Sequence, residues 1–210
     1  MKLFSIQNLA LTVLCSTLLI SGCGTSNISR AIAEYNKENY QNAREIYNSI
    51  LEVNPRDKKA RLNRGLTHTT EGNYEEAMND YNEAIELDDE YEQAYNNRGV
   101  LYYKLGDNAK AIADYNKAIE LDDDYAIPYV NRGRVHYDQG NYDKALADAE
   151  EAIEIDDDFA AAYLLRGEAK EAQGDENAAV EDYKVAYQKN EDFVPAQEKL
   201  REKNIDPETL

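Results

Sequence analysis

The sequence repeats itself with a period of 34 residues, and this periodicity limits the possible folds more than any other feature. The segment AIELDDDYA, at 118–126, recurs as AIELDDEYE at 84–92 and as AIEIDDDFA at 152–160. Periods of 20 to 50 residues are typical of proteins that stack one small structural unit. The positions that keep register are two series of glycines and two of alanines: Gly65, Gly99, Gly133 and Gly167; Gly72, Gly106, Gly140 and Gly174; Ala43, Ala77, Ala111, Ala145 and Ala179; Ala84, Ala118, Ala152 and Ala186.

Each unit predicts two helices joined by a tight turn. The helical spacing of apolar residues breaks at segments such as LGD and QGN, where glycine can adopt the left-handed conformation that ends a helix. The other glycine series lies inside the first helix, where glycine costs about 1 kcal/mol relative to alanine. Its recurrence indicates that another helix approaches closely there. One hairpin cannot bury its own apolar face, so about three stacked copies are needed for stability.

The first 23 residues have the layout of a secretory signal. Lys2 precedes an apolar stretch from about residue 9 to residue 20, which is shorter than the roughly 20 residues that span a bilayer. The ending ISGC, at 20–23, resembles the bacterial lipobox, whose cysteine becomes the acylated mature N-terminus. The resemblance implies a palmitate-bearing lipoprotein anchored through Cys23. An ordinary signal peptide and an uncleaved apolar anchor are the alternatives.

Two further expectations follow from this N-terminus. Gly24 implies export to the periplasmic face of the outer membrane if the host is Gram-negative, by resemblance to lipoproteins of that kind. Because Cys15 would leave with the signal and Cys23 would be blocked, disulfides and thiolate metal sites are excluded from the mature chain. The tether is short, and Asn27 or Ser29 is the expected cap of the first helix.

The segments YNNRGVLY, at 95–102, and AIADY, at 111–115, resemble the tetratricopeptide repeat, with Tyr for Trp, Arg for Leu and Tyr for Phe. The resemblance implies an all-α fold: a right-handed superhelical solenoid of about five helix-turn-helix repeats with a C-terminal capping helix. The expected divisions are a signal peptide at 1–22, a lipidated N-terminus and short tether at 23–28, a solenoid at 29–193, and a capping helix and tail at 194–210, with repeats at about 24–57, 58–91, 92–125, 126–159 and 160–193.

The acidic triplets lie where one repeat ends and the next begins. Clustered carboxylates can bind a divalent cation, but these triplets are a whole repeat apart, which favours a role as polar residues between helices. Asp124 or Asp158 is expected to accept the free amides of the following helix. Asp122 and Asp156 lie near the unfavourable end of the preceding helix dipole, and the sequence offers no stabilising role for them.

An aspartate follows each repeated arginine by sixteen residues. Two antiparallel helices joined by a short turn bring such positions opposite each other, which predicts an ion pair across each hairpin. A ligand-binding role is the alternative. The expected pairs are Arg64 with Asp80, Arg98 with Asp114, Arg132 with Asp148, and Arg166 with Asp182.

Charge and motif content narrow the possible functions. The net charge of −19 repels phosphate backbones and disfavours nucleic-acid binding. It is unevenly distributed, since residues 23–64 carry net +3 and residues 65–210 net −23. The segment RDKKARLNR, at 56–64, is expected to lie near the membrane. No catalytic triad, metal spacing or phosphate loop is present, so the sequence predicts no enzyme, no cofactor and no metal.

The resemblance also places a partner groove on the first helices. Such repeats use the concave wall to hold extended peptides or partner helices, and an amide often holds the ligand backbone. The carboxylate-binding clamp of some family members is not expected, because its lysine positions hold Leu62, Asn96, Val130 and Leu164. The expected groove residues are Asn63, Asn96, Asn97, Val100, Tyr103, Lys104, Val130, Asn131, Arg134, Tyr137 and Asp138, a wall of mixed apolar and amide character.

Two functions fit these expectations. The first is a non-catalytic interaction scaffold or adaptor in the bacterial envelope, similar to tetratricopeptide lipoproteins that assist pilus or secretin assembly. Its partner would be a protein or an extended peptide, and the acidic surface favours one with a basic patch. The second is a glycan- or peptidoglycan-binding module that uses exposed tyrosines of the groove. The sequence does not fix the oligomeric state.

Overall fold

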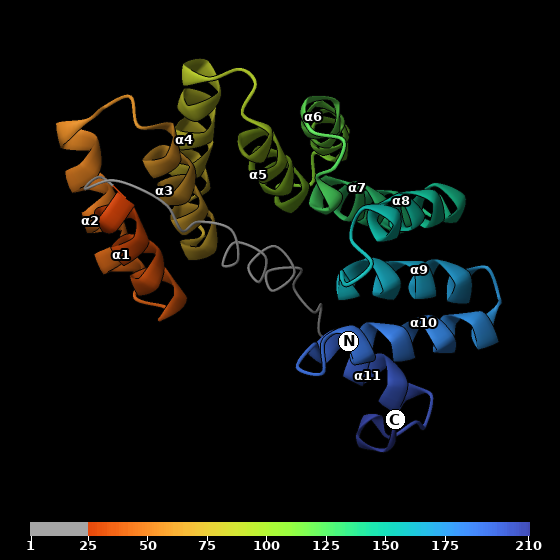
Figure 1. Ribbon diagram of the computed structural model, residues 1–210. Coiled ribbons are helices and arrows are strands. Elements are labelled where there is room, and N and C mark those ends of the chain that lie inside the picture. Colours follow the sequence, from red (N-terminus) through yellow and green to blue (C-terminus); the bar gives the residue numbers. More distant parts are fainter. Residues whose placement is uncertain (1–24) are drawn as a thin grey trace. The chain divides into compact units, whose positions relative to one another are not determined.

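The computed structural model describes residues 25–210, and it divides the chain into two compact units (Figure 1). Unit 1 ends at Asp107 and unit 2 runs from Asn108 to Leu210. The boundary falls in the turn between the two helices of the third repeat. Within the described range all regular structure is helical. The sequence prediction of an all-α chain of helical repeats with a C-terminal helix is confirmed.

Unit 1 is a two-layered stack of helices. The first helices of its repeats contact one another, α1 with α3 and α3 with α5, and the second helices pack against them. Each repeat therefore shares its core with the next, as a solenoid requires. The helices are α1 (Thr25–Asn36), α2 (Tyr40–Val53), α3 (Lys58–Glu71), α4 (Tyr74–Leu87) and α5 (Glu92–Lys104).

Unit 2 follows the same plan. The first helices α7 and α9 contact each other, α8 packs against both, and α10 packs against α9 and the terminal helix α11. Its elements are α6 (Asn108–Leu121), α7 (Ala126–Asp138), α8 (Tyr142–Ile155), α9 (Ala160–Ala172), α10 (Glu176–Lys189), α11 (Val194–Glu202) and a short 3-10 helix, η2 (Pro207–Thr209).

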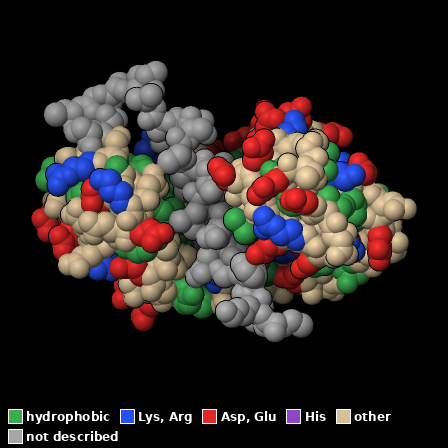
Figure 2. Space-filling model, turned by 90° about the horizontal axis from the view of Figure 1, so that it is seen from below, with side chains coloured by type: hydrophobic (Ala, Val, Ile, Leu, Met, Phe, Trp, Pro, Cys, Tyr) green, Lys and Arg blue, Asp and Glu red, His purple; other side chains and the backbone are tan. Residues whose placement is uncertain are grey.

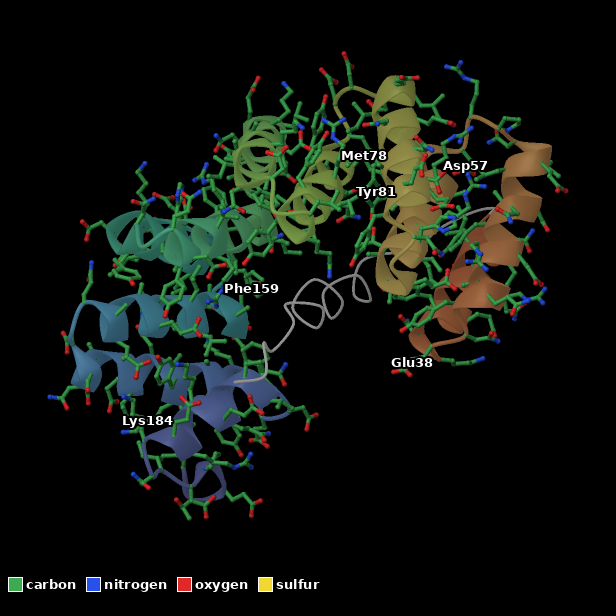
Figure 3. The ribbon with its side chains drawn as sticks, turned by 180° about the vertical axis from the view of Figure 1, so that it is seen from behind. Glu38, Asp57, Met78, Tyr81, Phe159 and Lys184 are labelled. Atoms are coloured by element: carbon green, nitrogen blue, oxygen red, sulfur yellow. The ribbon has the colours of Figure 1, made fainter. Side chains whose placement is uncertain are left out.

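The turn glycines end the first helices in the way that the sequence predicts. Gly72, Gly106, Gly140 and Gly174 have positive φ, between 76° and 92°. In the turn after α3, the amide of Asn73 donates to the carbonyl of His68 across 2.9 Å, which satisfies a carbonyl at the helix end. In the first repeat, Glu38 occupies the position of these turn glycines and has a φ of 61° (Figure 3).

The glycines inside the first helices make room for large side chains. A Cβ at Gly65 would lie 2.8 Å from the Tyr81 ring, and one at Gly167 would lie 2.6 Å from the Tyr183 ring. At Gly167 the carbonyl of Ala179 would be 3.1 Å away, so the expected close helix approach is present. Both tyrosines are fully buried, and Figure 3 marks Tyr81 on α4.

The acidic triplets act through their first residue, and the expectation that Asp124 or Asp158 caps the next helix is wrong. The Asp122 carboxylate accepts the amide of Asp124 at 3.2 Å, and Asp156 accepts that of Asp158 at 3.0 Å. The N-cap positions of α7 and α9 are Tyr125 and Phe159, which make no side-chain cap bond. Asx turns of this kind fold the chain locally between two helices.

The first described helix begins earlier than the sequence suggests. Because α1 starts at Thr25, Asn27 and Ser29 lie inside the helix and do not cap it. The predicted signal segment and Cys23 lie outside the described residues. None of the described helices has the length and apolar character needed to cross a membrane.

We predict that Glu38→Gly stabilises the protein by about 0.5 to 1 kcal/mol. A side chain in the left-handed region is strained, whereas glycine adopts it freely, and this gain exceeds the entropy that glycine adds to the unfolded chain. Chemical denaturation of both proteins measures the difference. Glu45→Gly, at an exposed helical position of α2, is the control and should lower stability by about 1 kcal/mol. Equal losses in both variants would contradict a strained turn.

Candidate partner-binding surface

The second, fourth and fifth repeats are each tied together by an arginine on the first helix. In the second repeat, Arg64 binds Asp80 through two hydrogen bonds, Nη2 to Oδ1 at 2.6 Å and Nε to Oδ2 at 2.9 Å. Its Nη1 also donates to Oδ1 of Asn48, on the preceding repeat, at 2.8 Å. We call a set of this kind, with its asparagine, arginine and aspartate each sixteen residues apart, an arginine bridge.

The arginine bridge recurs with small variations. Arg132 binds Asp148 at 2.6 Å and Asn116 at 2.6 Å. Arg166 binds Asp182 at 2.7 Å, and that carboxylate also accepts from Lys170. Arg98 donates to Asn82 at 2.8 Å, while its pairing with Asp114, which belongs to the other unit, stays a prediction. The structure thus contains three of the four ion pairs expected from the spacing.

The asparagines of these bridges were missed in the sequence analysis. They lie sixteen residues before each arginine, at Asn48, Asn82 and Asn116, so the same spacing argument applied upstream would have found them. The fourth repeat has Glu150 at this position, sixteen residues before Arg166. The bridges therefore join neighbouring repeats as well as the two helices of one hairpin.

A tyrosine lies beneath three of the bridging guanidinium groups. The Arg132 guanidinium is 5.4 Å from the Tyr129 ring centre, and the corresponding distances are 5.3 Å for Arg166 over Tyr163 and 5.5 Å for Arg98 over Tyr95. Cation–π contacts of this kind are favourable within about 6 Å. Tyr95 stands at the Trp position of the repeat pattern and Arg98 at its Leu position, so the two residues that depart from the pattern contact each other. These tyrosines have a packing role, which weakens the case for a row of glycan-binding rings.

In unit 2 the expected groove residues form a charged network, so the expectation of an apolar and amide wall is wrong there. Val130 and Asn131 are buried, and only Asp138 is exposed. Arg134 forms an ion pair with Glu168 on α9 and lies 5.2 Å from the Tyr137 ring centre. Long side chains on the facing first helices neutralise each other.

Glu171 extends this network to the C-terminal helix. Its carboxylate accepts from Tyr183 Oη at 2.8 Å, from Lys199 at 3.1 Å and from Lys203 at 2.5 Å. Burial alone would raise the pKa of Glu171, but the hydrogen bonds from Lys203, Tyr183 and Lys199 together lower it to about 2. α11 is therefore attached to α9 by charge as well as by the apolar contacts of Ala196 and Leu200.

In unit 1 the expected groove residues are apolar, aromatic or amide side chains, and Lys104 is the charged one. Asn96 and Val100 are buried, and Tyr103 and Lys104 are half-buried. Asn63 donates to the Lys59 carbonyl in its own helix at 2.8 Å, and Asn96 donates to Asn97 at 3.2 Å. Several of the expected amides are thus engaged within the protein. That any of them holds a ligand stays a prediction.

Most of the basic segment at 56–64 is neutralised. Lys58 forms an ion pair with Asp88, Arg61 with Glu83, and Arg64 with Asp80. In the described structure only Arg56 and Lys59 of this segment have no ion pair. The segment therefore carries less unpaired positive charge than its sequence suggests, and its position near a membrane stays a prediction.

The remaining polar candidates form no metal site. Among residues 25–210, no group of three or more His, Cys, Asp or Glu is placed to hold a metal ion. His68 and His136 each bury an Nδ1 atom without a hydrogen-bond partner. Burial lowers the pKa of both histidines, so they pack as neutral rings in separate units.

These features define a helical-repeat protein: hairpins stacked within each unit on a shared core, with arginines that bind asparagines of the preceding repeat at three junctions. Family models described as tetratricopeptide repeat match residues 90–158 and 130–192, and one described as TPR repeat matches residues 68–106. The chain is therefore built of tetratricopeptide repeats.

Solved structures agree with this assignment. MamA protein is 26% identical, with a TM-score of 0.61, over 85% of this chain and 94% of its own. PilW, a widely conserved type IV pilus biogenesis factor, is 20% identical with a TM-score of 0.72, over 82% and 80%. YrrB, a TPR protein with an unusual peptide-binding site, is 20% identical with a TM-score of 0.59, over 83% and 90%. The likeness to PilW and YrrB shows the fold alone. No curated protein matched.

We predict strong coupling between Arg132 and Asp148 in a double-mutant cycle. Asp148→Ala leaves a largely desolvated guanidinium without its carboxylate and should cost about 2 to 4 kcal/mol of unfolding free energy. Adding Arg132→Leu removes that unpaired charge and should recover about 1 to 2 kcal/mol. The exposed pair Lys184 and Glu181 is the control, with an expected coupling below about 0.5 kcal/mol. Additive losses at Arg132 and Asp148 would contradict a direct role for the pair.

We predict that the stabilising effect of Glu171 depends on pH. Its folded pKa of about 2 lies below the ordinary value of 4.5, so its contribution is complete above about pH 5 and declines as the pH falls towards 2. Glu171→Gln should cost about 1 to 2 kcal/mol at pH 7, and this difference should shrink steadily between pH 5 and pH 3. Denaturant unfolding at each pH measures it. Glu154→Gln, at an exposed position of α8, is the control; a difference for Glu171 that does not vary with pH would contradict the network.

Proposed function

We propose that this protein is a non-catalytic scaffold that binds a protein or an extended peptide on its first-helix layer. The observation that carries the proposal is the face of α1 and α3 in unit 1. Ile28 and Ile32 lie four residues apart on α1, Leu66 holds the position of Ile32 one repeat later on α3, and all three are half-buried, with Leu66 packed against the core. Second helices pack against the other side of this layer. Exposed apolar residues bordered by polar ones are typical of interaction surfaces.

The repeat architecture supports this proposal. Tetratricopeptide repeats build extended surfaces from their first helices, and such surfaces bind peptides and partner helices. YrrB, described as having a peptide-binding site, and PilW, a pilus biogenesis factor, share the fold. We extend this to an adaptor role in the bacterial envelope for the present chain. The glycan-binding alternative is less favoured, because Tyr95, Tyr129 and Tyr163 are stacked against arginines.

We further propose that the protein is a lipoprotein held at the membrane through Cys23, on the periplasmic face of the outer membrane in a Gram-negative host. The support is the sequence ISGC after an apolar stretch. The short distance between Cys23 and the start of α1 at Thr25 would hold the first repeat close to the bilayer.

The scaffold proposal is tested by substitution on the proposed face. Ile32→Asp places a charge on that face and should reduce, by at least fivefold, the partner captured from crosslinked envelope fractions. Val53→Asp, at an apolar position of α2 that is 88% exposed, is the matched control and should leave capture unchanged. Circular dichroism checks that both variants fold. Equal capture by the two variants would place binding elsewhere.

The anchoring proposal predicts that Cys23→Ala abolishes incorporation of labelled palmitate and leaves the protein unprocessed or free of the membrane fraction. Cys15→Ala, inside the predicted signal, should retain labelling and is the control. Labelling and membrane fractionation of the two variants measure the effect. Normal labelling of the Cys23 variant would refute lipidation at this residue.

A further inference from the structure

The two layers of unit 1 differ in charge. The first helices α1, α3 and α5 together carry seven Lys or Arg and three Glu. The second helices α2 and α4 carry one Arg and seven Asp or Glu. In a chain with a net charge of −19, the layer proposed to bind a partner is therefore basic. Figure 2 shows Asp and Glu spread over the visible surface, with Lys and Arg in smaller groups.

Three of these cations, Arg30, Lys59 and Lys104, have no ion pair in the described structure, and the two lysines are the ones on α3 and α5. Lys59, near the start of α3, is exposed, and Lys104, at the end of α5, is half-buried. Neither has an ion pair in the described structure, whereas Lys58, Arg61 and Arg64 are all neutralised by carboxylates of α4 or the turn after it. Burial also lowers the pKa of Lys104, as expected for an ammonium group that has lost water without gaining a partner.

Both lysines share a helix face with the apolar residues of the layer. Spacings of three and four residues place Lys59 on the side of Leu62 and Leu66, and Lys104 on the side of Asn96 and Val100. Of these four neighbours Leu66 is half-buried and the other three are buried. The apolar side chains of α1 and α3 thus lie between two ends that each carry an amine. Eleven positions along such helices correspond to about 16 Å, and packed helices lie about 8 to 10 Å apart. The combined separation is about 18 Å, which an extended chain covers in about five to six residues.

We propose that the first-helix face of unit 1 binds an acidic, partly apolar segment of another protein, with internal carboxylates at Lys59 and Lys104. The inference rests on the proposed function and specifies its partner. The docked segment is acidic in this proposal, whereas the net charge of the whole protein favours a partner with a basic patch. Net charge governs the approach of a distant partner, whereas two unpaired amines beside apolar side chains govern which segment docks. Unit 2 offers no equivalent, because Arg134, Lys199 and Lys203 are paired with glutamates of α9.

The test begins with a displayed library of random twelve-residue peptides selected on the full chain. Enriched peptides should contain Leu, Ile or Val together with two Asp or Glu about five residues apart. They are then synthesised with acetylated N-termini and amidated C-termini, so that a terminal carboxylate cannot contribute. Enrichment of Lys and Arg, or no enrichment over the uncoated support, would overturn the proposal.

Binding of these peptides is compared in two double variants that remove the same charge. Lys59→Gln with Lys104→Gln should weaken binding about tenfold, as expected for two exposed or partly exposed charge contacts. Lys144→Gln with Arg201→Gln, both exposed in unit 2 and without ion pairs in the described structure, should change it less than about twofold. If both double variants lose the same affinity for the peptides, the loss comes from net charge alone, and the proposed site at Lys59 and Lys104 is wrong.

The two proposals fail separately. If Ile32→Asp abolishes capture of an envelope partner while Lys59→Gln with Lys104→Gln has no effect on it, the scaffold function stands and the acidic specificity is wrong. If neither set of variants affects capture, both proposals fall.

Discussion

The arginine bridge is the interaction on which the rest of the structure depends. A guanidinium has five donors in a rigid plane, so one side chain can bind a carboxylate on its own hairpin and an amide on the previous one. Arg64 does both, with Asp80 and Asn48, and its side chain is largely buried. Since each aspartate is nearly buried, breaking one contact leaves a charge without solvent. The bridges therefore favour one register between repeats.

The sequence predicts the fold well because its signals are local and repeated. The turn glycines and the sixteen-residue spacing each depend on short stretches of one hairpin. Because pairs such as Arg132 and Asp148 recur in several repeats, the pattern is recognisable even where one copy deviates from it. Contacts between repeats were harder to foresee. The bond from Arg132 to Asn116 and the ion pair of Arg134 with Glu168 depend on how one hairpin is rotated against the next, which the pattern within a hairpin does not specify.

The candidate surface was the least predictable part. Helical spacing gives which residues share a face, but not which of them are already engaged by neighbours. Glu168 and Glu171 convert the expected apolar wall of unit 2 into a network of ion pairs, whereas Lys59 and Lys104 keep their charges available in unit 1. The acidic triplets show the same limit on a smaller scale, since an Asx turn at Asp122 and a cap at Asp124 have the same sequence signature.

The arginine bridge also affects how such a chain could change its length. The second and third 34-residue segments each carry an arginine, the aspartate that follows it and the asparagine that serves the next segment, so a tandem duplication of either copies a complete set of junction residues. The ends of the array show where that copying stops: Arg30 has Ile46 in place of an aspartate sixteen residues later, and Arg166 has Glu150 in place of the asparagine before it. An internal repeat could thus be gained or lost without a new interface, while the terminal repeats, each already specialised, could not be exchanged.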